Sequence, residues 1–113
     1  MKILLSLLML VTLNACAPFA ELQKRPADFQ GETAKSPDIF IACALPKIIN
    51  LWELARVVPD GDKRIIIVSH GAGLGAALTL SATPQATGSH IEFRQMTSLR
   101  TFTTEWELAK SCL

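Results

Sequence analysis

The segment Lys63-Arg64-Ile65-Ile66-Ile67-Val68-Ser69 decides the fold of this chain of 113 residues. Four consecutive β-branched apolar residues favour an extended strand. An apolar run without alternation is typical of a strand covered on both faces, so we expect residues 63–69 to form the central strand of a sheet. The preceding Asp60-Gly61-Asp62 is a turn signal, and it predicts a hairpin between residues 56–59 and this strand.

Two amphipathic runs follow the central strand. Residues 76–82 and residues 90–94 alternate between apolar and polar side chains, which is typical of strands with one buried face. The segment 83–89 between them contains proline and glycine, and we expect it to be a loop that joins the two runs as an antiparallel pair. The side chains predicted to face the core are Leu78, Leu80, Ile91 and Phe93.

A helix is predicted from Pro37 to about Leu54. Ser36 is a favourable N-cap, and a proline followed by an acidic residue is typical of a first helical turn. Because proline lacks an N–H group, we expect a bend or break at Leu45-Pro46. Ile39 and Cys43 lie one turn apart on one face with Phe40 and Ala44 beside them, so this face is predicted to point to the core.

A short second helix is predicted near the end of the chain. Thr104 to Glu107 matches a capping box, and this helix would carry Cys112 back to the first helix. We therefore expect an α+β fold, in which a small antiparallel sheet of three to four strands packs against an N-terminal helix and a short C-terminal helix. Residues 36–113 would form this single domain. Residues 16–35 show no periodicity and are interpreted as a flexible tether.

The first fifteen residues have the three-part organisation of a signal peptide. Lys2 supplies a positive charge, residues 3–13 are almost entirely apolar, and a small residue, Ala15, precedes Cys16. The apolar run is too short for a resident membrane-spanning helix. We expect residues 1–15 to be removed on export.

Leu13-Asn14-Ala15-Cys16 resembles the lipobox of bacterial lipoproteins, and the resemblance covers this leader alone. It implies that Cys16 becomes the new N-terminus and carries palmitate or similar acyl chains, which would anchor the protein to a membrane. Ala17, where inner-membrane lipoproteins tend to have aspartate, implies sorting to the outer membrane, facing the periplasm. The alternatives are an ordinary secretory signal peptide with a chance cysteine, or a buried N-terminal helix.

With Cys16 assigned to lipid, Cys43 and Cys112 remain as a pair. Exported proteins fold in an oxidising compartment, so we predict a disulfide between them. The alternative is two free, buried thiols.

The charge of the chain does not indicate a nucleic-acid partner. The sequence has 11 basic and 10 acidic residues, and it shows no basic face that could bind phosphates.

The glycine-rich segment 70–75 follows the predicted central strand. Its Gly-x-Gly-x-x-Ala pattern resembles the dinucleotide-binding fingerprint, with Glu92 about twenty residues further on. The helix that this fingerprint requires is missing, because residues 78–84 alternate and end in proline. No cofactor is therefore expected, and the segment is interpreted as a hairpin loop. The residues of a possible recognition loop are His70, Gly71, Gly73, Leu74 and Gly75.

No catalytic or metal site is expected. Ser69 lacks the Gly-x-Ser-x-Gly setting of a nucleophile elbow, and the remaining candidate for acyl-transfer catalysis is a set of Ser69, His90 and Asp62. The histidines and cysteines lack metal-ligand spacing. We expect a small membrane-anchored envelope lipoprotein with a structural or protein-binding role and an envelope protein as possible partner. The alternative is a periplasmic inhibitor or exclusion factor that acts on an incoming enzyme or phage through residues 70–75, and a hydrolase ranks third.

Overall fold

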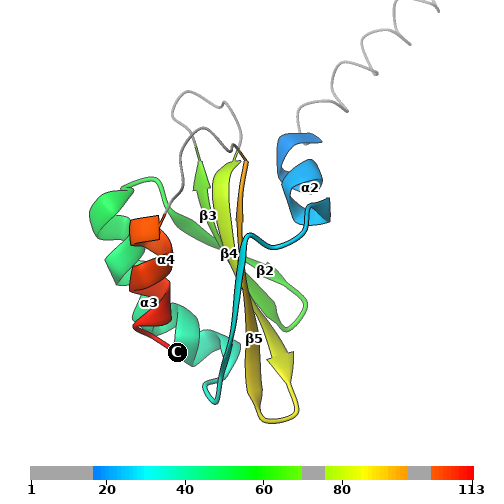
Figure 1. Cartoon of the computed structure of the whole chain (residues 1–113), viewed down its shortest axis with the longest axis vertical. Helices are drawn as coiled ribbons and strands as arrows, with labels where there is room; N and C mark the ends of the chain where they lie inside the picture. Colours follow the sequence, from blue (N-terminus) through cyan, green and yellow to red (C-terminus); the bar gives the residue numbers. More distant parts are fainter. Residues whose placement is uncertain (1–16, 70–75, 97–102) are drawn as a thin grey trace, which may run out of the picture.

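The computed structural model describes residues 17–69, 76–96 and 103–113. These residues form an α+β fold with a five-stranded antiparallel sheet in the order β1-β5-β4-β3-β2 and three helices (Figure 1). The expected fold class is confirmed, and the sheet has more strands than predicted. The elements are α2 (Ala17–Lys24), β1 (Phe29–Thr33), α3 (Pro37–Leu51), β2 (Arg56–Asp60), β3 (Lys63–Ser69), β4 (Ala76–Gln85), β5 (Gly88–Gln95) and α4 (Thr103–Lys110).

The sheet is covered on both faces. The main core lies between the sheet and the helices α3 and α4, and a smaller cluster on the opposite face includes Leu22 of α2 (Figure 1). This arrangement explains the apolar run of β3. Ile66 and Val68 belong to the main core, and Ile65 and Ile67 pack with Leu22. The prediction of a strand buried on both faces is confirmed, but the central strand is β4, because β5 and β1 lie beyond it.

The two predicted hairpins are both present. In the first, Asp60 pairs with Lys63 across a turn in which Gly61 has a φ of 60°. In the second, the alternation of β4 and β5 places their predicted apolar residues in the main core. The loop predicted over residues 83–89 is wrong, because β4 continues through Pro84 to Gln85. A proline is tolerated there because the pairing of β3 with β4 ends at Ala82.

The segment predicted to be an irregular tether contains regular structure. Residues 17–24 form helix α2, and residues 29–33 form edge strand β1, which pairs with β5. Tertiary contacts account for β1. The ring of Phe29 stacks on Trp106 with centroids 5.5 Å apart and lies 5.7 Å from Phe93.

Helix α3 begins as predicted and does not break. The Ser36 side chain accepts a hydrogen bond from the Ile39 N–H at 3.4 Å, which caps the helix. The helix then continues through Pro46 to Leu51. Ala42, whose carbonyl loses its usual partner at Pro46, lies on the exposed side of the helix, where water can replace the missing donor.

The inner face of α3 differs from the predicted one. Its buried residues are Phe40, Ile41, Ala44 and Ile48, and Cys43 packs at their margin. Ile39 was predicted to face the core and is 59% exposed. Phe40 and Ala44, which were expected beside Ile39 and Cys43, occupy the inward positions, so the centre of the buried face is shifted by about one residue.

Candidate anchoring site and exposed surfaces

The predicted lipidation site and recognition loop lie outside the described residues. Cys16 immediately precedes α2, and the loop residues His70, Gly71, Gly73, Leu74 and Gly75 lie between β3 and β4. The structure describes the segments that flank them. These segments include α2, which follows Cys16, and the structure also describes the disulfide region and the exposed surface of α3.

Helix α2 is attached to the sheet by its second turn. Leu22 is fully buried in a cluster with Ile65 and Ile67, against which Met96 also packs. The amide of Gln23 donates a hydrogen bond to the Thr79 hydroxyl at 2.9 Å. At 1.5 Å per helical residue, the helix rises about 7.5 Å from Ala17 to Leu22. The first turn of α2 therefore lies close to the point at which the helix is held on the sheet.

Hydrogen bonds also hold the residue that follows α2, Arg25, on the end of β5. The guanidinium of Arg25 donates from Nη1 to the carbonyls of Gln95 at 2.9 Å and Met96 at 2.7 Å. The carbonyl of Arg25 in turn accepts a hydrogen bond from Nε of Arg94 at 2.7 Å. Because Arg94 is largely buried and also pairs with Glu92 at 2.6 Å, the chain after α2 is held on the end of β5.

Replacing Leu22 by serine should release α2 from the sheet, because a polar side chain would enter an apolar cluster and leave a cavity. The expected result is faster cleavage by trypsin after Lys24. Limited proteolysis followed by mass spectrometry measures this rate. The matched control is Glu21→Ser on the same helix, since Glu21 is exposed. Equal cleavage rates in the two variants would contradict the docking role of Leu22.

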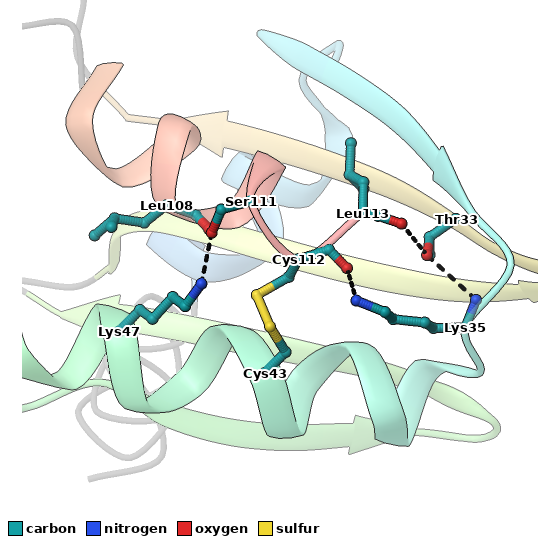
Figure 2. The surroundings of a disulfide bond; sticks show 8 residues. All are labelled: Thr33, Lys35, Cys43, Lys47, Leu108, Ser111, Cys112 and Leu113. Carbon is teal, nitrogen blue, oxygen red and sulfur yellow. Dashed lines mark hydrogen bonds between the residues drawn. A yellow bond between two sulfur atoms is a disulfide. The ribbon is translucent and has the colours of Figure 1, made fainter.

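The predicted disulfide is present. Cys43 of α3 and Cys112, which follows α4, are joined with their Cα atoms 5.8 Å apart (Figure 2). Cys112 is fully buried at the edge of the main core. The bond therefore ties α3 to the last residues of the chain, as expected from the sequence.

Hydrogen bonds from two sides hold the residues around Cys112. On one side, the Lys35 ammonium donates to the Cys112 carbonyl, and the Thr33 hydroxyl donates to the Leu113 carbonyl at 3.0 Å (Figure 2). On the other side, the Lys47 ammonium donates to the Ser111 hydroxyl at 2.6 Å. The last residues are thus fastened to both β1 and α3.

The structure does not bring the candidate catalytic residues Ser69, His90 and Asp62 together. Ser69 and Asp62 lie at opposite ends of β3, and seven residues of strand separate them by roughly 23 Å. His90 instead donates from Nδ1 to Glu32 of β1 at 2.6 Å. Its Nε2 lies 3.9 Å from Glu92. The histidine therefore belongs to a row of polar contacts that ties edge strand β1 to β5.

An apolar stripe runs along the outer side of α3. Its members are exposed and follow one another at intervals of three and four residues, so they share one face of the helix. We define the α3 stripe as Ile39, Ala42, Pro46 and Ile49. Of these four residues, Ile39 was predicted to face the core, and an outer apolar face of this helix was not predicted.

Among residues 17–69, 76–96 and 103–113, no group of three or more His, Cys, Asp or Glu side chains is placed to hold a metal ion. In the same part of the chain, no helix has both the length and the hydropathy needed to cross a membrane. Comparison with models of known protein families, with curated proteins and with solved structures gave no match.

Proposed function

We propose that the protein is a small lipoprotein of the bacterial envelope, anchored through Cys16 to the outer membrane and facing the periplasm, with a structural or protein-binding role. The lipobox resemblance of Leu13-Asn14-Ala15-Cys16 supports the anchor. The proposal includes no catalytic activity.

The Cys43–Cys112 disulfide is the structural observation that carries the proposal. Disulfides form and persist in exported proteins and are rare in the cytosol. The bond joins residues that are 69 positions apart, so it constrains most of the domain. Such a bond would form in an oxidising compartment. A signal peptide over residues 1–15 would export the chain to one.

The α3 stripe supports a binding role. A surface helix usually carries polar residues on its outer side, whereas α3 is apolar on both its inner and outer sides. Asp38 and Lys47 are the charged residues within the helix. Exposed apolar surface of this kind is typical of a contact with another molecule.

The anchor is tested by replacing Cys16 with serine. The wild-type protein, expressed with its leader in a Gram-negative host, should incorporate radiolabelled palmitate and be recovered in the outer-membrane fraction. The variant should incorporate none and accumulate as a precursor that retains residues 1–15, because the acyl acceptor is gone. Cys43→Ser is the matched control, since it removes a different cysteine and should keep the label. An unlabelled wild-type protein would contradict the proposal.

Crosslinking in intact cells followed by purification tests the binding role. Recovery of a resident envelope protein supports the role proposed here. Recovery of a foreign hydrolase or phage protein would instead favour the alternative, an inhibitor or exclusion factor. An Ile49→Asp variant should reduce capture if the α3 stripe is the contact, and Asn50→Asp, its exposed neighbour, is the matched control.

A further inference from the structure

We propose that one end of the folded domain rests on the lipid surface through Leu51 and Leu54. We call this end, which also includes the start of α2, the anchor end. The inference rests on the proposed lipid anchor at Cys16 and adds the orientation of the domain on the membrane. It rests on three observations: where α2 begins, where α3 ends, and how the two ends of the domain differ in polarity.

The start of α2 and the end of α3 lie at the same end of the molecule. Both are in the upper half of Figure 1, where the first turn of α2 is drawn in blue and the last turn of α3 in green. Hydrogen bonds place the segments that adjoin the two helices. Nε1 of Trp52, just after α3, donates to Glu105 in the first turn of α4 at 3.1 Å. Arg25, just after α2, bonds to Gln95 at the end of β5.

The anchor end carries exposed apolar side chains. Leu54 is 61% exposed and Leu51 is 48% exposed, and they flank the half-buried Trp52. Arg56 follows and is also exposed. Leucine and tryptophan beside arginine are typical of segments that lie in a membrane interface, where the apolar groups enter the acyl boundary and the cation stays among the phosphates. Glu53 is exposed as well and would remain at the headgroup level.

The opposite end of the domain carries several charged groups, with Ile39 as an exposed apolar side chain beside them. The β2–β3 turn lies there, with Asp60, Asp62 and Lys63 in sequence around it. Arg64 bonds to Asp38 at the start of α3 at 3.1 Å. Charged groups are costly to bring into contact with lipid, so this end is suited to water. The polarity of the two ends therefore agrees with an anchor attached directly before α2.

The short connection makes the orientation specific. Leu22 is buried against the sheet, so little chain separates the anchored residue from the body of the domain. A long flexible tether would let the domain tumble, whereas a docked helix restricts it. Lipid on Cys16 would thus bring the anchor end to the bilayer and keep the charged end away from it.

The test uses the full-length lipidated protein, purified in detergent without reductant and reconstituted into vesicles of phosphatidylethanolamine and phosphatidylglycerol. Three variants each add one tryptophan: Leu54→Trp and Leu51→Trp at the anchor end, and Ile39→Trp at the other end of α3. Ile39 is a close match to Leu54, because their exposed fractions are 59% and 61%. The readout is the tryptophan fluorescence of each variant minus that of the wild-type protein, which we call the added emission. It is compared between vesicles with and without brominated acyl chains.

We expect brominated lipid to reduce the added emission of Leu54→Trp and Leu51→Trp by about twofold, as for groups at the acyl boundary. The added emission of Ile39→Trp should not change. Equal quenching at both ends, or no quenching in protein that floats with the vesicles and carries palmitate, would overturn the orientation and leave the anchor intact. Protein that carries no palmitate and does not float would overturn the anchor, and the orientation with it.

Discussion

Replacing both Cys43 and Cys112 by alanine is expected to lower the free energy of unfolding by about 4 kcal/mol, the chain-entropy value for a loop of this length. The disulfide joins residues 69 positions apart, so its loss releases most of the unfolded chain from a constraint. Urea denaturation followed by circular dichroism measures the change. The total stability of a domain of this size is about 5 to 15 kcal/mol, so the variant would keep only part of it.

The control for this experiment is the wild-type chain unfolded with and without reductant. Reduction opens the same bond while it keeps both sulfur atoms in the core, so it separates the effect of the bond from that of side-chain volume. If reduction and the double substitution lower the free energy of unfolding by similar amounts, the disulfide bond itself supplies the lost stability. Unfolding midpoints that do not move in either case would contradict a stabilising disulfide.

Replacing Gly88 by alanine is expected to cost about 3 kcal/mol or more, because strained backbone and a steric clash each contribute about 1 to 3 kcal/mol. Gly88 has a φ of 133°, which side chains rarely allow. An added Cβ would lie 1.9 Å from the Thr33 carbonyl oxygen of β1. The variant should therefore loosen the pairing of β1 with β5, and amide hydrogen exchange in residues 29–33 should rise.

Gly61→Ala is the matched control. Gly61 also has a positive φ, 60°, but an added Cβ would meet no atom within 4 Å. The expected loss is about 1 kcal/mol, from the left-handed backbone alone. The difference between the two variants measures the contact between β5 and β1 together with the greater backbone strain at a φ of 133°. Equal losses would contradict a steric role for Gly88.

The sequence correctly predicted those elements whose conformation is determined by a few neighbouring residues. The apolar run of β3, the turn at Gly61 and the cap at Ser36 each depend on a few neighbouring residues. The disulfide was also predictable, because Cys43 and Cys112 remained as an even pair.

Tertiary contacts account for what the sequence did not predict. Residues 29–33 contain one large apolar side chain, Phe29, and become a strand because that ring stacks on Trp106 from α4. The orientation of α3 was wrong for a related reason. Both sides of the helix are apolar, so periodicity did not distinguish Ile39 from Phe40 as the inward residue.

The candidate site was predicted from the sequence only in part. The residues expected to carry function, Cys16 and the segment 70–75, lie outside the described part of the chain, so they remain predictions. The attachment of α2 through Leu22 could not be predicted from its own segment, because the partners are Ile65 and Ile67 on a distant strand. The exposure of Leu51 and Leu54 likewise depends on where α3 ends in the fold.

The docking of α2 on the sheet bears on the order of events during export. Leu22 packs against strand β3, and Arg25 bonds to the end of β5, so the surface that receives α2 is made by residues that follow it by at least forty positions. A chain that crosses a membrane from its N-terminus therefore delivers α2 before its binding surface exists. In an exported lipoprotein, Cys16 would stay accessible to the acylating enzymes during this interval, and the domain would close onto the bilayer only after β5 had emerged.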